Sequence, residues 1–304
     1  MQKDLLGIQP LSAETIRHLL TSARRHKAKV RDPAQRDDTR KHVALNTLFY
    51  ENSTRTKMSF LMAGEYLGAK AADLNVATGS VCKGETFLDT GKVLDRMGID
   101  VLVVRHGMAG APHLLARNVR ACVVNGGDGS NEHPTQALLD ALTILEHKGS
   151  FTGLNVAIVG DIANSRVARS NVFLLKTMGA SVTLVGPATM LSAELATLGA
   201  AVTTDVRQAV RDADVVMALR IQAEREKGSK FPSLTEYARY FGVNASVLEG
   251  ARPDALVMHP GPVNRGVELT ADVIDGARSV ILDQVENGVA VRMAVLEYCL
   301  EGLR

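Results

Sequence analysis

The stretch LNVAIVGDIANSRVARSNVFLLKTMGASVTLV, Leu154 to Val185, decides the fold class. Two apolar, β-branched runs, Asn155–Val159 and Ser181–Val185, flank a polar turn and a stretch of helical period at Ser165–Met178. Apolar runs without alternation are typical of parallel strands that are covered on both faces. The order of strand, helix and strand therefore predicts a crossover unit of a parallel sheet.

The same alternation recurs along the chain and predicts an α/β protein. The other expected strands are His42–Phe49, Lys70–Asn75, Val101–Val104, Ala121–Asn125, Ala201–Thr204, Asp214–Leu219, Ala255–Met258 and Ser279–Leu282. The other expected helices are Ala13–Lys27, Arg55–Leu67, Thr86–Met97, Pro134–His147 and Gly288–Leu303. The polar segment Glu224–Phe241 contains Gly228 and Pro232, and we expect it to form a long surface loop.

The length and one turn-rich segment predict two domains of similar size. A chain of 304 residues corresponds to about two average domains. The segment HKGSFTG, His147–Gly153, is rich in turn-forming residues, and a new strand–helix unit follows it. We expect a first domain over residues 1–147 and a second over 148–287, each a parallel sheet flanked by helices. From the residues alone, the last helical stretch, 288–304, could pack on either half.

The composition excludes several classes of protein. A hydrophobic fraction of 46% with 22% charged residues indicates a globular protein, and a net charge of +2 is too balanced for nucleic-acid binding. The sequence contains no apolar run long enough to cross a membrane and no secretory signal at its start. Three scattered cysteines, Cys82, Cys122 and Cys299, predict a reducing cytoplasm and neither a disulfide framework nor a structural zinc site.

Polar segments follow several expected strands, at the edge where open α/β sheets bind ligands. The first is STRT, Ser53–Thr56, whose hydroxyls, guanidinium and helix N–H groups favour an oxyanion such as phosphate; helix capping is the alternative. The second is GSVCKGET, Gly79–Thr86, which differs from a nucleotide-binding P-loop because Glu85 would repel phosphates. Its Lys83 could reach an anionic ligand or could be a solvated surface lysine.

Two further segments lie at the start of the expected helices Pro134–His147 and Ser165–Met178. In NEHPTQ, His133 and Gln136 lie on one face of a helix start, where the histidine can donate to a carbonyl oxygen and the glutamine can bind a carbamoyl group. Helix capping by His133 is the alternative. The segment GDIANSRVARS, Gly160–Ser170, lacks the glycines of a dinucleotide fingerprint. Its Arg166 and Arg169 oppose the helix dipole, which indicates an anionic ligand, with solvated arginines as the alternative.

The last two segments lie after late strands. In LRIQAER, Arg220 and Gln222 are two residues apart and would point the same way in extended backbone. In MHPGPVNRGVEL, the stretch His259–Pro262 forms a rigid turn that can present backbone carbonyls to a ligand.

Taken together, these segments resemble the transcarbamoylase family. STRT at Ser53–Thr56 and HPTQ at His133–Gln136 are similar to the carbamoyl phosphate motifs of that family. The segments SVCKGET, GDIANSRVARS and HPGPVNRGVE resemble its aspartate branch, and the order of motifs and the length match over the whole chain. The chain departs from the pattern at Asn52 and at Lys57, where arginine is more common, and we expect effects on packing or affinity there.

The resemblance implies a reaction in which carbamoyl phosphate and L-aspartate give N-carbamoyl-L-aspartate and phosphate, an early step toward pyrimidines, with no cofactor and no metal. It implies a carbamoyl phosphate domain with the C-terminal helix packed back on it, an aspartate domain, and a homotrimer with shared active sites. The trimer could be free, bound to regulatory chains, or bound to a dihydroorotase.

The resemblance also assigns roles to individual residues. The expected contacts to carbamoyl phosphate are Ser53, Thr54, Arg55, Thr56, Ser80, Arg105, His133 and Gln136. The expected contacts to L-aspartate are Lys83, Arg166, Arg220, Gln222, Gly261 and Pro262. Arg55, Thr56, His133 and Lys83 are the expected catalytic residues, with Ser80 and Lys83 contributed by a neighbouring subunit.

Three other functions are weighed against this one. A transcarbamoylase acting on ornithine would need acidic contacts in place of the paired arginines. An inactive paralogue would lack Arg55 or His133, and both are present. A nucleotide-dependent oxidoreductase would carry a glycine fingerprint that this sequence lacks.

Overall fold

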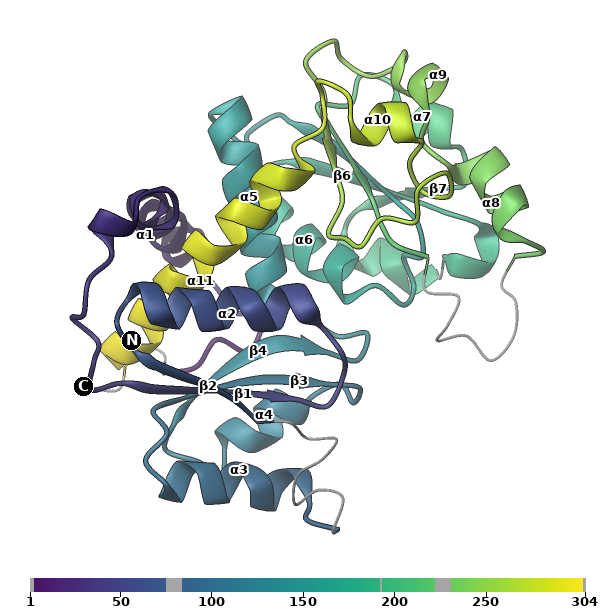
Figure 1. Ribbon diagram of the computed structural model, residues 1–304. Coiled ribbons are helices and arrows are strands. Elements are labelled where there is room, and N and C mark those ends of the chain that lie inside the picture. Colours follow the sequence, from purple (N-terminus) through teal and green to yellow (C-terminus); the bar gives the residue numbers. More distant parts are fainter. Residues whose placement is uncertain (1–2, 75–83, 192, 222–230, 303–304) are drawn as a thin grey trace. The chain divides into compact units, whose positions relative to one another are not determined.

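The computed structural model describes residues 3–74, 84–191, 193–221 and 231–302. The chain divides into two compact units: a first unit of Met1–Leu142 with Glu286–Arg304, and a second unit of Thr143–Val285 (Figure 1). Each unit is a parallel β-sheet flanked by helices, which confirms the predicted fold class. The boundary expected after His147 falls in the last turn of helix α5 (Pro134–Lys148), which contributes residues to both units.

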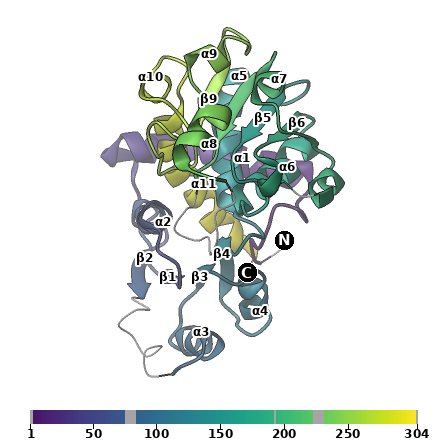
Figure 2. The ribbon, with the colours of Figure 1, turned by 90° about the vertical axis from the view of Figure 1, so that its right-hand side faces the viewer.

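The first unit contains a four-stranded sheet in the order β2-β1-β3-β4. Its strands are β1 (Ala44–Phe49), β2 (Lys70–Leu74), β3 (Val101–His106) and β4 (Cys122–Asp128). Its helices are α1 (Ala13–Arg31), α2 (Thr54–Tyr66), α3 (Phe87–Arg96), α4 (Ala111–Ala116), the first half of α5 and most of α11 (Ile281–Gly302), with a short 3₁₀ turn η1 (Pro33–Gln35). Helices α2 and α3 cover opposite faces of this sheet (Figure 2).

Apolar side chains on β1 and β3 build the core between the sheet and helices α3 and α4. Leu48, Leu102 and Val104 pack against Leu94 of α3 and Leu115 of α4, and all five are buried. Since both faces of the sheet are covered, the strands are apolar at successive positions, which is the pattern visible in the sequence.

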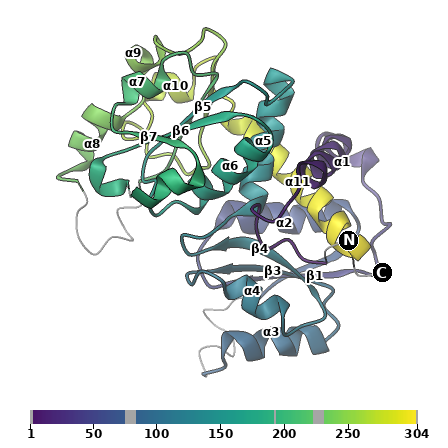
Figure 3. The same ribbon diagram turned by 180° about the vertical axis from the view of Figure 1, so that it is seen from behind.

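The second unit contains a five-stranded sheet in the order β7-β6-β5-β8-β9. Its strands are β5 (Asn155–Val159), β6 (Ser181–Val185), β7 (Ala201–Thr203), β8 (Val215–Ala218) and β9 (Leu256–Met258). Its helices are α6 (Arg166–Thr177), α7 (Val206–Val210), α8 (Leu234–Phe241), α9 (Ala245–Leu248) and α10 (Ala271–Ile274), with 3₁₀ turns η3 (Ala188–Met190) and η4 (Ala193–Leu198). Helices α7, α9 and α10 cover one face of the sheet and α6 covers the other (Figure 3).

The expected strand at Ser279–Leu282 is wrong. Ser279 makes only a single bridge to Val257, and Ile281 already begins helix α11. A short apolar run fits either a strand or the first turn of a buried helix, so periodicity alone does not separate the two. Although α11 has 22 residues, neither it nor any other helix in the described segments is long and apolar enough to cross a membrane.

The expected loop at Glu224–Phe241 is wrong in its second half, because α8 forms there. The Ser233 hydroxyl accepts a hydrogen bond from the Glu236 N–H, and Tyr237 is buried with its ring stacked on Phe241. A serine followed three residues later by glutamate is a helix-start signal that we overlooked beside Pro232. Residues 222–230 lie outside the described part of the chain.

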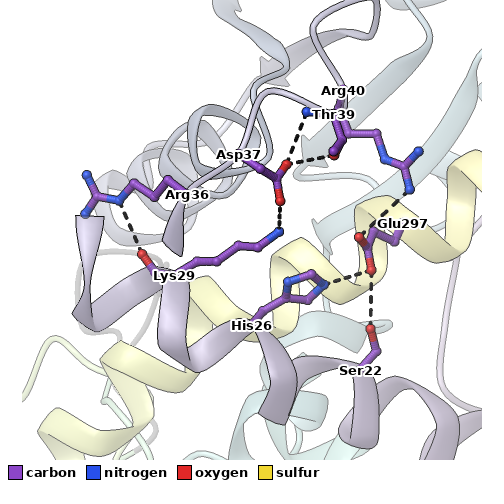
Figure 4. Close-up of polar contacts among 8 residues, drawn as sticks. All are labelled: Ser22, His26, Lys29, Arg36, Asp37, Thr39, Arg40 and Glu297. Carbon is purple, nitrogen blue, oxygen red and sulfur yellow. Dashed lines mark hydrogen bonds and ion pairs between the residues drawn. The ribbon is translucent and has the colours of Figure 1, made fainter. Parts of the chain in front are cut away.

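Glu297 of α11 binds groups from α1 and from the segment after it (Figure 4). Its carboxylate lies 2.8 Å from His26 Nε2 and 3.9 Å from Arg40 Nη2, and accepts a hydrogen bond of 3.4 Å from the Ser22 hydroxyl. The hydrogen bond with His26 lowers the pKa of Glu297, burial opposes this, and the charges of Arg40 and Lys29 support it. Ionised Glu297 therefore stabilises the packing of α11 on α1.

We predict that Glu297→Gln lowers the thermal midpoint at about pH 7 by about 2–4 °C, the effect of losing about 1 kcal/mol in a unit of this size. Because the folded-state pKa is lowered, the stabilisation is present above the unfolded pKa of glutamate and disappears as the pH falls through the folded value. The difference between the two proteins should therefore shrink as the pH falls below the usual pKa of glutamate. Glu301→Gln, an exposed position on the same helix, is the matched control. A difference that does not change with pH would contradict this account.

Candidate active site

The turn between β1 and α2 carries the STRT segment. Ser53 occupies the N-cap position of α2, yet in the described structure its side chain accepts no hydrogen bond from the first turn. Simple capping therefore does not account for this residue. The first N–H groups of the helix do not bond to the Ser53 hydroxyl and can donate to another acceptor. Thr54 and Arg55 are exposed, whereas Thr56 is buried against the unit. The segment thus presents N–H groups, hydroxyls and one guanidinium to solvent.

Lys57, where the family pattern more often has arginine, is engaged inside the first unit. Its Nζ lies 2.8 Å from Oδ2 of Asp73 on β2, and Oδ1 of the same carboxylate accepts a hydrogen bond from the Thr47 hydroxyl of β1. Lys57 therefore fastens the start of α2 to the sheet.

Arg105 lies at the end of β3, beside the end of β1. It pairs in register with Phe49, the last residue of β1. Its Nη1 donates to the Gly126 carbonyl at 3.1 Å, and its Nε lies 3.6 Å from Oε2 of Glu51, which belongs to the turn before α2. These contacts hold a half-buried guanidinium at the same edge of the sheet as the STRT segment.

His133 and Gln136 open helix α5, directly after β4. The His133 carbonyl accepts from the Gln136 N–H at 3.0 Å, which places both residues in the first turn. Both are buried, and Nε2 of Gln136 donates to Oδ1 of Asp140 at 2.9 Å. The first turn of α5 therefore carries a histidine and an oriented amide.

A buried hydrogen-bond network fixes the loop that precedes His133. Nδ2 of Asn125 donates to Oδ1 of Asp128, which also accepts from the Glu132 N–H. Gly129 has a positive φ of 50°, and a Cβ there would lie 2.9 Å from the Ala109 backbone nitrogen, so glycine is required. No local sequence pattern indicates that Asn125 and Asp128 organise this loop.

The sheet order explains why these segments share one edge. Strand β3 lies between β1 and β4, and all three are parallel. Their carboxyl ends therefore face the same way and bring together the STRT turn, Arg105 and the His133 turn. Two guanidinium groups and two helix N-termini make this edge positive. Ser80 and Lys83 lie outside the described residues.

In the second unit, Arg166 and Arg220 follow adjacent strands. Arg166 begins α6 after β5, is buried, and stands next to Ser165, whose hydroxyl caps the helix. Arg220 follows β8, which pairs with β5. By contrast, Arg169 lies over the Phe173 ring and is exposed. The paired strands thus bring Arg166 and Arg220 to one edge, while Gln222 lies outside the described residues.

A buried glutamate that sequence analysis missed organises the edge that carries Arg220. Oε1 of Glu268 accepts from the Ile221 N–H at 2.8 Å, and Oε2 accepts from the Asn264 N–H at 2.7 Å. Burial raises the pKa of Glu268, while these hydrogen bonds and that of the Asn264 side chain oppose the increase. The carboxylate thereby ties the residue after Arg220 to the loop that follows β9.

That loop contains Gly261 and Pro262, joined by a cis peptide bond. The Gly261 N–H donates to Nδ1 of His259 at 2.8 Å, and the His259 N–H donates to Oε1 of Gln284 at 3.0 Å. The turn is therefore held from both sides. Across the described segments, no group of three His, Cys, Asp or Glu side chains is arranged to hold a metal ion.

The two units carry complementary chemistry. The first unit gathers groups that bind an oxyanion beside a histidine and an amide, which fits a phosphate attached to a carbonyl group. The second unit places two arginines at one sheet edge, which fits a molecule with two carboxylates.

Two family models together match most of the chain. Residues 3–146 match the family model described as the carbamoyl-P binding domain of aspartate/ornithine carbamoyltransferase. Residues 152–299 match the model described as the Asp/Orn binding domain of the same family.

Individual relatives span nearly the whole chain. The aspartate carbamoyltransferase catalytic subunit of Acetivibrio thermocellus is 56% identical over 97% of this chain and 94% of its own. That of Methylorubrum populi is 52% identical over the same shares of the two chains, 97% and 94%.

Solved structures show the same fold. The aspartate transcarbamoylase of Trypanosoma cruzi in complex with carbamoyl phosphate and aspartate has a TM-score of 0.85 and 30% identity, covering 96% of this chain and 95% of its own. The ornithine carbamoyltransferase of Pyrococcus furiosus has a TM-score of 0.83 and 32% identity, with the same coverage of 96% and 95%. The chain belongs to the aspartate/ornithine carbamoyltransferase family.

Proposed function

We propose that the chain is the catalytic chain of an aspartate carbamoyltransferase, which transfers the carbamoyl group of carbamoyl phosphate to the amino group of L-aspartate. The proposal is carried by the residue types at two sheet edges: groups suited to an oxyanion in the first unit, and two arginines, Arg166 and Arg220, in the second. The curated relatives at 50–56% identity are aspartate enzymes, which supports the same substrate. The reaction is an early step toward pyrimidines.

In this proposal, the first unit binds carbamoyl phosphate. Ser53, Thr54 and Thr56 donate hydroxyl and backbone hydrogen bonds to the phosphate. Arg55, the exposed guanidinium of the STRT turn, neutralises the charge that grows on the phosphate as it departs. Arg105, fixed by Glu51 and the Gly126 carbonyl, reaches the carbonyl side of the same ligand.

The carbonyl carbon is made electrophilic by the first turn of α5. His133 and Thr56 donate to the carbonyl oxygen, on which negative charge develops in the tetrahedral intermediate. Gln136 accepts a hydrogen bond from the carbamoyl amino group. Carbamoyl phosphate is already an activated acyl donor, so orientation and charge stabilisation supply the catalysis, and the proposal requires neither a cofactor nor a metal.

The second unit binds L-aspartate. Arg166 and Arg220 each pair with a carboxylate, with Gln222 beside them, and the carbonyls near Gly261 and Pro262 accept from the amino group. The neutral amine attacks the carbonyl carbon, the C–O bond to phosphate breaks, and the amine loses a proton. The products are N-carbamoyl-L-aspartate and phosphate.

The proposal includes the assembly and the location. Residues 1–147 with 288–304 form the carbamoyl phosphate domain, and 148–287 form the aspartate domain. Three copies form a trimer in which Ser80 and Lys83 of one chain complete the site of its neighbour, with regulatory chains or a dihydroorotase as candidate further partners. A cytoplasmic location is supported by Cys122 and Cys299, neighbouring buried thiols that are not joined in a disulfide.

The runner-up function is carbamoyl transfer to L-ornithine, since ornithine enzymes share the fold at TM-scores of 0.83 and 0.87. We predict that phosphate release from carbamoyl phosphate is at least about 100-fold faster, as kcat/KM, with L-aspartate than with L-ornithine, because a buried arginine rejects an ammonium group. Both amino acids are tested with one preparation under matched conditions. Faster reaction with ornithine would refute the proposed substrate.

The shared site predicts complementation between two inactive variants. Arg55→Ala and Lys83→Ala should each lower kcat by about 10²–10³-fold, because each removes a charge that stabilises the departing phosphate. In every mixed trimer, one site combines an intact Arg55 with an intact Lys83 from the neighbouring chain, so co-refolded variants should regain activity.

The control mixture combines Lys83→Ala with Arg117→Ala in place of Arg55→Ala. Arg117 is an exposed arginine of the first unit, so this mixture shows the activity expected when Arg55 is intact in every chain. Trimer formation is verified by sedimentation. Mixed trimers that regain no activity would show that Arg55 and Lys83 must act from one chain.

A further inference from the structure

Gln136 makes a buried contact that the proposed reaction does not account for. Its side chain and that of Asp140 lie four residues apart on α5, with Nε2 of the amide 2.9 Å from Oδ1 of the carboxylate. Asp140 is fully buried and Gln136 nearly so. A buried carboxylate one turn behind a ligand-binding glutamine is costly unless its charge is compensated, so its presence calls for an explanation.

The chemistry of the pair determines which end of the glutamine amide faces away from Asp140. An ionised carboxylate only accepts hydrogen bonds, and an amide donates only from its nitrogen. Nε2 must therefore lie toward Asp140, and Oε1 is the end that can accept from a ligand N–H.

Arg292 of α11 carries a positive charge that interacts with that of Asp140. The residue is buried, its Nη1 donates to the Gly288 carbonyl at 2.9 Å, and its guanidinium lies 5.1 Å from the ring centre of Phe60 on α2. Burial lowers the pKa of Arg292, and the charge of Asp140 raises it. A Cβ on Gly288 would lie 2.7 Å from Nη1 of Arg292, so a larger residue at position 288 would clash with the guanidinium.

We propose that Asp140 is a positioning residue for Gln136: it holds the amide nitrogen, so that the oxygen of the Gln136 amide faces the carbamoyl amino group. The inference rests on the proposed function, because it names the ligand group that Gln136 recognises. A protonated or amide side chain at position 140 could donate to Oε1 of Gln136. The side-chain amide of Gln136 could then rotate by 180°. The amide nitrogen of Gln136 would then face the nitrogen of the ligand, and two donors would oppose each other.

The test compares two ligands that differ in the group Gln136 would contact. Phosphonoacetamide carries the phosphonate and the amide, whereas inorganic phosphate carries no amide. We expect Asp140→Asn to weaken the binding of phosphonoacetamide by about tenfold, the loss of one oriented hydrogen bond. Binding of inorganic phosphate should change less than about twofold, because its contacts do not involve Gln136. Titration calorimetry measures both.

A double-mutant cycle separates positioning from a general loss of structure. Gln136→Ala alone must produce the same selective loss for phosphonoacetamide. Adding Asp140→Asn to Gln136→Ala should then change the affinity for phosphonoacetamide less than about twofold, because no amide remains to be oriented. The matched control is Asp95→Asn, a buried carboxylate of the same unit that accepts from the Arg120 and Ala121 N–H groups. It should leave both affinities unchanged.

Asp140→Asn leaves Arg292 without its anion and could unfold the unit, which circular dichroism detects. Asp140→Asn combined with Arg292→Met removes both charges together and is the second variant, with the same expected pattern. The inference is overturned if the folded variant binds phosphonoacetamide as wild type does, if phosphate loses as much, or if the loss persists in the Gln136→Ala background. It is also overturned if Gln136→Ala causes no selective loss. The proposed function fails separately, if the wild type releases no phosphate in the presence of L-aspartate.

Discussion

The parallel direction of β1, β3 and β4 is the constraint on which the rest of the first unit depends. Because these neighbouring strands run the same way, the turns that follow them meet at one edge of the sheet. Helices α2 and α5 begin there and point their N-termini toward the same region. Three segments that are far apart in the sequence thereby contribute to one positive site, and the second unit repeats the principle with β5 and β8.

Positive groups gathered in this way repel one another unless carboxylates separate and hold them. The structure provides such a carboxylate for two of the basic groups. Glu51 lies beside Arg105 at the end of β3, and Asp73 holds Lys57 at the start of α2. Arg55 remains exposed at the tip of the STRT turn. The arrangement keeps the framework charges fixed.

The sequence predicted the strands best where both faces are buried. Asn155–Val159 and Ser181–Val185 match β5 and β6, because a fully covered strand must be apolar throughout. The same rule produced the wrong strand at Ser279–Leu282, since the first turn of a buried helix is apolar too. The helix at Leu234–Phe241 was missed because Pro232 received more weight than the capping serine after it.

For the site, the sequence indicated which residue types follow the strands but not the contacts that hold them. Sheet order brings Arg105 beside the STRT turn, and no local pattern encodes that order. The hydrogen bond from Ile221 to Glu268 joins residues 47 positions apart, and the charge pair of Asp140 with Arg292 joins two helices. Such contacts depend on the tertiary fold, so the buried acidic residues that position the site could be found only in the structure.

The central claim is that the first turns of α2 and α5 bind the two ends of one phosphate-bearing ligand. Backbone N–H groups at a helix start that lack an intrahelical partner exchange their hydrogens quickly unless a ligand binds them. Hydrogen exchange followed by mass spectrometry, with and without saturating phosphonoacetamide, tests the claim directly. The account predicts slower exchange in peptides that cover Ser53–Thr56 and His133–Gln136, with little change at the start of α6. Protection confined to the second unit, or absent from both first-unit turns, would contradict it.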